Sequence, residues 1–244
     1  ISGGSAAAQA AAAADSFKLL ATMERTFKGA VTPMPVDEIA IIRKLTDRAP
    51  SLLGVHKRSL SRYGARLIGK FQEQTSLGLA LGESTPQIVE RIQTTGDLEW
   101  WQAERIVRTE TAYAYNAAQR DAITAQAEEL DDPLLCAQWS EQADENGAPL
   151  DDRVAVDSLA MHGQVAPSGG VFTMPPTSPV PDSKGRTKVP DALVGKTWDC
   201  PPNRPNDRSA LIPWRPDWDL PGWVWRSGRR VDAARALGKR GRAA

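Results

Sequence analysis

The stretch from Asp97 to Leu130 constrains the fold of this chain most, because it contains no Gly or Pro. It is rich in Ala, Glu, Gln and Arg, which are all good helix formers. The carboxylate of Asp97, directly after Gly96, can accept the orphan amide hydrogens of a first helical turn. The sequence therefore predicts one long helix over Asp97–Leu130 with Asp97 as its cap.

The polar residues of this helix gather on one face, because spacings of four and seven residues return to nearly the same angle. That face carries Arg105, Thr109, Asn116 and Arg120, and the opposite face, with Val107, Thr111, Ala114 and Ala118, can be buried. Two interpretations of the polar face remain open. Either this face is solvated, or the helix ties other elements or subunits together through Arg108, Thr109, Glu110 and Asn116. Exposed charges usually contribute little to stability, so physics alone favours the solvated face.

Arg108 and Glu110 differ in the partners that their own helix offers. Glu104 lies four residues before Arg108, in the favoured order for a helical ion pair. Glu110 has only uncharged neighbours three and four residues away, so we expect its charged partner to come from elsewhere. Arg108 and Glu110 point to nearly opposite sides of the helix and cannot pair with each other.

Several short motifs follow one another in a fixed order along the chain. The helix contains Arg108-Thr109-Glu110-Thr111 and then Asn116, and after it come Trp139, Asp152-Arg153-Val154, His162-Gly163 and Pro201-Pro202-Asn203. Over roughly Ser84 to Trp214, this ordered set resembles the tailed-phage head morphogenesis family, the MuF-type minor head proteins. The resemblance implies a structural protein that joins the portal and the head during assembly, with no common catalytic activity.

The composition changes after Asp132-Pro133, where Pro and Gly become frequent and helical periodicity is lost. Candidate strands are Leu134–Ser140, Val154–Leu159, Gly170–Met174 and Leu211–Trp214, with an irregular excursion over Pro175–Pro190. We predict an α+β fold in three parts. Residues 1–130 are mainly helical and dock on the portal or shell, residues 131–214 form a small loop-rich α/β module, and residues 215–244 form an irregular Trp- and Pro-rich basic tail.

Within the helical part, apolar spacing predicts helices over Asp15–Lys28, Asp37–Ala49 and Val55–Leu81. Ser84-Thr85-Pro86-Gln87 predicts the start of another helix, because Gln87 stands three residues after Ser84 as in a capping box. The basic start of the Val55–Leu81 run is interpreted as a solvated face rather than a nucleic-acid contact. The Trp100-Trp101 pair is interpreted as a packing anchor.

Acidic and basic residues balance at thirty each, so the overall charge implies no partner, but the two signs are unevenly distributed. Between Asp131 and Asp157 there are eight acids and one base. The stretch from Arg226 to Arg242 has seven bases against Asp232: Arg226, Arg229, Arg230, Arg235, Lys239, Arg240 and Arg242. This basic segment indicates a contact with packaged double-stranded DNA or with an acidic surface of the portal. A solvated, disordered tail is the alternative.

Metal binding and catalysis have few candidate residues. Asp152, Asp157, His162 and Cys200 could ligate a metal, but zinc commonly takes closely paired Cys or His ligands. Many proteins of the resembled family carry Cys pairs near the His-Gly and late Pro-Asn segments, and Pro202–Arg208 has none. We therefore predict no metal, no cofactor and no catalytic site. His162 is interpreted as a structural hydrogen-bonding residue beside a turn at Gly163. A Cys200–His162 nucleophile pair has little support.

Partners and location follow from the resemblance. It implies the portal protein and the major capsid or scaffold protein as partners, and a place in the virion head near the portal after assembly in the host cytoplasm. Two cysteines make no disulfide framework, which fits a reducing cytoplasm, and no apolar run is long enough to cross a membrane. The chain begins at Ile1, which is compatible with a piece of a longer protein. The alternatives are a toxin-associated module of the same fold family and a hydrolase using Asp152, Asp157 and His162.

Overall fold

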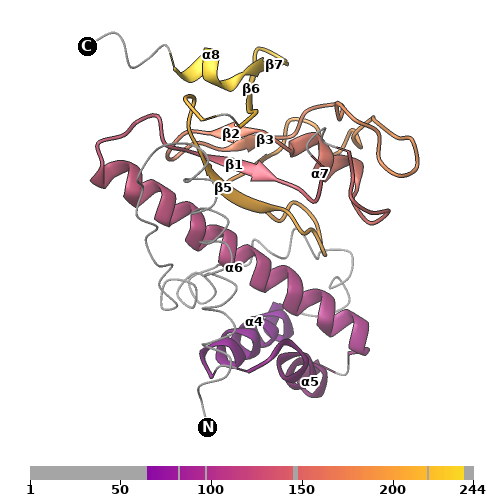
Figure 1. The fold of residues 1–244 in the computed structure, drawn as a ribbon. Coiled ribbons are helices and arrows are strands. Elements are labelled where there is room, and N and C mark those ends of the chain that lie inside the picture. Colours follow the sequence, from indigo (N-terminus) through magenta and orange to yellow (C-terminus); the bar gives the residue numbers. More distant parts are fainter. Residues whose placement is uncertain (1–64, 82, 97, 145–147, 219, 239–244) are drawn as a thin grey trace.

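The computed structural model describes residues 65–238, apart from 82, 97, 145–147 and 219. Its centre is one long helix, α6 (Trp100–Glu129), with two helices on one side and a small sheet module on the other (Figure 1). The described residues before Leu130 form only helices, and all described strands come later, in agreement with the α+β prediction. The helices predicted over Asp15–Lys28 and Asp37–Ala49, and the first part of Val55–Leu81, lie outside the described residues.

On the helical side, α4 (Ala65–Ala80) and α5 (Thr85–Gly96) pack against the N-terminal half of α6. α5 begins as predicted, because the Ser84 N–H donates to the side-chain Oε1 of Gln87 at 2.8 Å. Buried apolar side chains of the three helices form one cluster: Phe71, Ile88, Val89, Ile92, Leu98, Ala103, Ile106, Val107 and Ala114. Removing these side chains from water is the main force that holds α4 and α5 on α6.

The start of α6 differs from the prediction, since the helix begins after Glu99 and the predicted cap at Asp97 is wrong. The Glu99 N–H donates to the side-chain Oε1 of Gln102 at 3.3 Å, which closes the first turn. Leu98, just before, is buried in the helical cluster, so its burial fixes where the helix can start. Among the described residues, no helix combines the length and the apolar character that a membrane span requires.

The C-terminal half of α6 lies on a three-stranded antiparallel sheet with the order β2-β1-β5. The central strand β1 (Cys136–Ser140) pairs with β2 (Val165–Ala166) and β5 (Ala210–Trp214), and Trp139 lies opposite Leu211. A short pair, β3 (Phe172–Thr173) and β4 (Thr197–Trp198), adds Phe172 to the core. The Trp139 and Phe172 rings meet edge to face with centroids 5.4 Å apart.

Three of the four predicted strands are confirmed by β1, β3 and β5. The fourth, Val154–Leu159, is wrong, because this stretch leads into the short helix α7 (Val156–Met161). Every residue of α7 is buried. A short apolar run that is buried on all sides fits a strand and a helix equally well, so periodicity could not separate them here.

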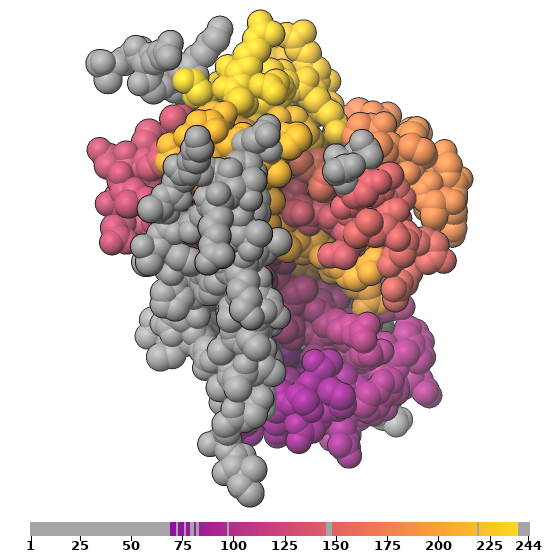
Figure 2. All heavy atoms as spheres, viewed as in Figure 1, coloured from indigo at the N-terminus to yellow at the C-terminus, as the bar shows by residue number. Residues whose placement is uncertain are grey.

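Residues 220–238 of the C-terminal segment are folded, so the prediction of an irregular tail is wrong for them. β6 (Trp223–Arg226) and β7 (Arg229–Asp232) form a hairpin, and α8 (Ala233–Leu237) follows. The hairpin turns through Ser227 and Gly228, which both have positive φ, as tight two-residue turns require. A cluster of Cys136, Val165, Trp214, Val224, Ala233 and Leu237 fixes it to the sheet module, at the end of the molecule away from α4 and α5 (Figure 2).

Candidate functional site

The polar face of α6 is a buried contact with the sheet module at Asn116, which is 2% exposed. Its Oδ1 accepts from the Leu211 N–H at 2.8 Å, and its Nδ2 donates to the Ser209 carbonyl at 3.1 Å. The solvated-face interpretation is therefore wrong for this residue. The backbone entering β5 supplies the two partners that water would otherwise supply.

Thr109 and Arg120 extend the same contact along α6. The Oγ1 of Thr109, which is fully buried, accepts from the Asn206 N–H at 3.2 Å. The Arg120 guanidinium donates to the Gly170 carbonyl at 2.7 Å and lies 3.5 Å from the Asp199 carboxylate. α6 thus ties together segments that lie far apart in the chain, as the second interpretation expected for Thr109 and Asn116, and Arg120 adds a contact that was not predicted.

Arg108 and Glu110, also on α6, have different surroundings. The Arg108 side chain is 63% exposed and pairs with Glu104 at 2.8 Å, which confirms its predicted local partner. Glu110 is only 4% exposed, so its carboxyl group is withdrawn from water. That Glu110 pairs with a residue distant in sequence stays a prediction.

The loop that follows Pro202 is organised around the buried carboxylate of Asp207. Its Oδ2 accepts from the Asn203 N–H at 2.9 Å. Its Oδ1 accepts from the Ser209 N–H at 3.1 Å and from the Ser158 hydroxyl at 3.2 Å. The Pro-Pro-Asn motif therefore places a backbone donor on a buried acid, which fixes the path of the loop into β5.

Arg204 joins this loop to the start of α7. Its Nε donates to the Ser158 hydroxyl at 3.1 Å and lies 3.5 Å from the Asp157 carboxylate. Burial raises the pKa of the Asp157 carboxyl, and the charge of Arg204 opposes that rise. The Asn203 side chain is also buried, and its Nδ2 has no hydrogen-bond partner within the described residues.

A second buried carboxyl, Glu141, lies beside Asp207, and Ser209 bridges the two. Burial, and then the charge of Asp207, raises the pKa of Glu141 to about 7. Glu141 and Ser209 were not among the site residues predicted from the sequence. Strand pairing could have found them, because Glu141 follows Ser140, Ser209 precedes Ala210, and Ser140 pairs with Ala210 across the sheet.

His162 and Gly163 hold the end of β1. The His162 Nδ1 accepts from the Glu141 N–H at 3.1 Å, and the Gly163 N–H donates to the Trp139 carbonyl at 2.8 Å. Gly163 has φ 76°, which favours glycine. Burial, and then the charge of Arg230, lowers the pKa of His162 and keeps the accepting nitrogen free of a proton. This geometry matches the predicted structural role of His162.

The three residues of the hydrolase alternative are engaged separately. Asp152 is exposed at the surface, where its carbonyl accepts from the Ser183 hydroxyl at 3.2 Å. Asp157 pairs with Arg204, and His162 accepts from a backbone amide. Within the part of the chain that the structure describes, no three His, Cys, Asp or Glu side chains are placed to hold a metal ion.

Arg153 and Cys200 have different surroundings. The Arg153 side chain is 75% exposed and pairs with Asp151 at 3.2 Å. The Asp151 carboxylate also accepts two hydrogen bonds from the Arg208 guanidinium. The side-chain bond from Arg208 lowers the pKa of Asp151 to about 2. Cys200 is buried and makes no disulfide.

The predicted basic residues of the C-terminal segment divide into three groups. Arg226, Arg229 and Arg235 are exposed and form no ion pair within the described residues, whereas Lys239, Arg240 and Arg242 lie outside them. Arg230 differs, because it donates to the Ala160 carbonyl at 2.7 Å and lies over the Trp223 ring. Burial lowers the pKa of Arg230 to about 10. The prediction of an anion contact by Arg230 is therefore wrong, since its guanidinium is used inside the fold.

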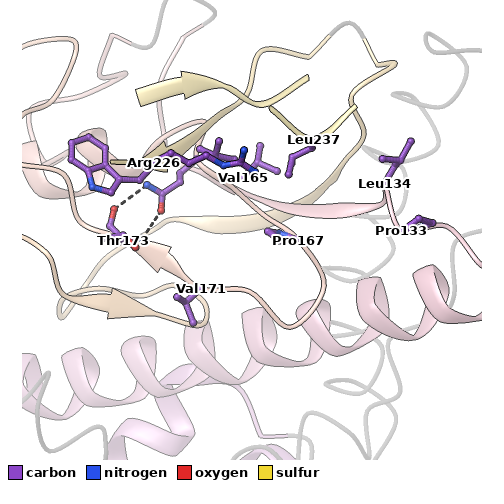
Figure 3. A pocket seen from close by; sticks show the side chains of 11 residues that line it. Pro133, Leu134, Val165, Pro167, Val171, Thr173, Arg226 and Leu237 are labelled. Atoms are coloured by element: carbon purple, nitrogen blue, oxygen red, sulfur yellow. Dashed lines mark hydrogen bonds between the residues drawn. The ribbon is translucent and has the colours of Figure 1, made fainter. Parts of the chain in front are cut away.

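A pocket of about 400 Å³ opens between β2, β3, β6 and α8 (Figure 3). Its lining is mainly apolar: Pro133, Leu134, Val165, Pro167, Val171, Val224 and Leu237 contribute, with Gln164, Thr173, Trp225 and Arg226. The Gln164 amide is engaged by Thr173, because it accepts from the Thr173 N–H at 2.6 Å and donates to the Thr173 carbonyl at 2.9 Å. This pocket therefore offers apolar surface and one exposed guanidinium, that of Arg226.

Comparison of the chain with protein-family models, with curated proteins and with solved structures found no match.

Proposed function

We propose that this chain is a structural minor head protein of a tailed bacteriophage, of the MuF type. It would be assembled in the host cytoplasm and built into the virion head near the portal. The observation that carries the proposal is the hydrogen bonding of Asn116, from the signature helix, to Ser209 and Leu211, which follow the Pro-Pro-Asn motif. Segments that lie more than ninety residues apart in the chain are thus parts of one folded unit.

The use made of the motif residues supports a structural protein rather than an enzyme. Thr109, Asn116 and His162 each direct their side chain to a backbone group of another segment. Trp139 lies in the core with no exposed surface, and Asn203 donates its N–H to a buried acid. These residues hold α6 and the sheet module together. A structural component of a particle needs such a stable internal contact.

The start of α6 is the surface that we assign to the portal, or to the capsid or scaffold protein. Trp100 is 46% exposed and Trp101 is 53% exposed, so their interpretation as packing anchors is wrong. The Arg105 guanidinium lies 5.0 Å from the centroid of the Trp101 ring, which orients that indole. Trp and Arg contribute more than other residues to the binding energy of protein interfaces.

The opposite end of the molecule is the surface that we assign to packaged double-stranded DNA. Arg226 and Arg229 face each other across the β6–β7 hairpin, and both are exposed. Like charges directly opposite each other destabilise a hairpin. A bound anion would reduce the repulsion between the two guanidinium groups. Phosphate groups of DNA supply such anions.

A portal pull-down with the full chain tests this proposal. The double variant Trp100→Ala/Trp101→Ala should lose portal binding with an unchanged melting temperature, because neither indole is buried in the core. The matched control is Leu150→Ala, which removes a 62% exposed apolar side chain from the sheet module. The control should bind like the wild type. Absence of binding by the wild type would contradict the proposed function, and equal binding by all three proteins would contradict the assigned surface.

A further inference from the structure

The hydroxyl of Ser209 lies between two buried carboxyl groups. Its Oγ is 2.8 Å from Glu141 Oε2 and 2.7 Å from Asp207 Oδ1. A hydroxyl has one proton to donate, so it can donate to only one of these oxygens. The other short contact requires a carboxyl group that carries a proton and donates it to Ser209. The short contacts are therefore satisfied best when the two carboxyl groups share one proton in addition to the hydroxyl proton of Ser209.

The distribution of donors places that proton on Glu141. Asp207 accepts from two backbone N–H groups, those of Asn203 and Ser209, in addition to hydroxyl contacts. Glu141 Oε1 accepts from the Gln142 N–H at 2.8 Å, and its Oε2 contacts the Ser209 hydroxyl. Hydrogen bonds from several donors favour the ionised form of a carboxyl group. Ser209 thus donates to Asp207 and accepts from a protonated Glu141.

We propose that the proton held between Glu141 and Asp207 through Ser209 is a pH-controlled latch on the loop that docks the sheet module onto α6. With the proton in place, Ser209 bridges both acids and the loop is closed. Without it, two buried carboxylates face a single hydroxyl proton, repel each other and loosen the loop. The effect reaches α6 because Asn116 holds the Ser209 carbonyl and the neighbouring Leu211 N–H.

Among the described residues, the basic groups near Glu141 are bonded to other acids, although the side-chain bond from Asp151, and then the charges of Asp151, Glu141 and Asp207, raise the pKa of Arg208. Arg208 donates to both oxygens of Asp151, and Arg204 is engaged with Asp157. α6 contributes the uncharged side chains of Thr109 and Asn116 to this contact. The titratable groups of the surrounding elements are Arg204 and Arg208 from the loop, Asp144 and Asp151 from the segment after β1, Asp157 and His162 from α7 and its end, and Arg230 from β7.

The latch opens as the pH rises. Burial and the charge of Asp207 raise the pKa of Glu141 to about 7, from an ordinary value of 4.5. The folded chain therefore holds this proton more tightly than the unfolded chain. The stability that it contributes is complete below pH 4.5 and is lost as the pH rises through about 7.

Hydrogen exchange of the full chain, read on peptides that cover residues 203–212, tests the latch. Rates at about pH 5.5 and about pH 8.5 are corrected for the intrinsic pH dependence of exchange, and protection of the wild type should fall by about tenfold or more. Glu141→Gln should keep its protection at both pH values. A Gln amide can accept from the Gln142 N–H and donate to Ser209, yet it cannot titrate.

The control Glu128→Gln changes an exposed acid on α6 and should behave like the wild type. Wild-type protection that does not change with pH, or a Glu141→Gln variant that keeps the wild-type change, would overturn the proposal. If Glu141→Gln does not fold, infrared spectroscopy of the wild type decides. A carbonyl band of a buried protonated carboxyl at about pH 6 that vanishes above neutral pH supports the latch. Its absence at that pH overturns it.

Discussion

The side chain of Asn116 accepts a hydrogen bond from the backbone of Leu211 at 2.8 Å, across 95 positions of the chain. Leu211 is the residue of β5 that lies opposite Trp139 of β1. The bond therefore sets the position of the sheet on α6 at the point where the module core begins. Because the amide also donates to the Ser209 carbonyl, one side chain satisfies a buried donor and a buried acceptor.

Replacing Asn116 should destabilise the fold strongly. Asn116→Ala leaves the Leu211 N–H and the Ser209 carbonyl unpaired in a buried place, and each unpaired group costs about 1–3 kcal/mol. Asn116→Asp keeps an oxygen that accepts from the Leu211 N–H. Its second carboxylate oxygen faces the Ser209 carbonyl in place of the Asn116 N–H donor, so this variant should lose at least as much stability. Urea unfolding measures both free energies of unfolding. The exposed control Glu128→Ala should change the free energy by less than about 0.5 kcal/mol, and equal values for the three variants would contradict the account.

Glu110 and Glu104 should respond differently to truncation, although they lie on the same helix. Glu104 pairs with the exposed Arg108, and such pairs contribute about 0.3–0.5 kcal/mol. Glu110 is 4% exposed, so surrounding groups must stabilise its carboxyl group in place of water. Glu110→Ala removes the carboxyl group and leaves those groups without their partner. We expect Glu110→Ala to lower the melting temperature and the particle yield more than Glu104→Ala. Equal melting temperatures and equal yields would argue against this prediction.

Protonation of His162 should destabilise the fold at acidic pH. Burial, and then the charge of Arg230, lowers its pKa below 6.5, so the folded chain holds the proton less tightly than the unfolded chain. Stability from this group is present above pH 6.5 and is lost as the pH falls through the lowered value. His162→Asn keeps an acceptor for the Glu141 N–H and should flatten the fall in melting temperature between about pH 6.5 and about pH 5. The variant retains His56. If its melting temperature falls with acid as steeply as that of the wild type, another group causes the acid sensitivity.

How much of this architecture the sequence predicts depends on whether the signal is local. The α6 run, the Ser84–Gln87 start of α5 and the strand at Leu134–Ser140 depend on neighbouring residues, and each was found. The faces of α6 were only half predicted, because a wheel places Thr109 and Asn116 together but cannot show that a loop ninety residues later covers them. Trp100 and Trp101 were misjudged for the same reason, since composition does not reveal what packs on a side chain.

The buried acid pair shows a second limit of local signals. Glu141 and Asp207 look like ordinary members of an acidic, loop-rich segment. They become unusual only because antiparallel pairing of β1 with β5 brings the end of one strand to the start of the other. Arg230 is the converse case. It looks like its basic neighbours, but the hairpin directs it onto Trp223 and the Ala160 carbonyl.

DNA binding should depend on Arg226 and Arg229, because their guanidinium groups are exposed and unpaired within the described residues. Each phosphate neutralised on duplex DNA contributes roughly −0.9 to the slope of log affinity against log salt. The double variant Arg226→Ala/Arg229→Ala should therefore reduce the magnitude of that slope by about 1.8. Binding to a duplex of arbitrary sequence, measured across a salt series, gives this slope.

The matched control for this prediction is Lys184→Ala/Lys196→Ala, which removes two exposed bases from the sheet module. It should leave the slope nearly unchanged. Arg230→Ala should instead lower the melting temperature, because it vacates a buried contact with the Ala160 carbonyl. Equal slopes for the wild type and the Arg226/Arg229 variant would show that the hairpin does not bind DNA.

Mass spectrometry of purified particles tests our proposal that this chain is a component of a phage head. The chain should be present in DNA-filled particles, in a fixed ratio to the portal protein that does not change through successive purification steps. The Asn116→Asp variant should be depleted from particles, because its module is no longer held on α6. Particles that are complete and infectious without the chain, or that lose it on simple washing, would contradict the claim.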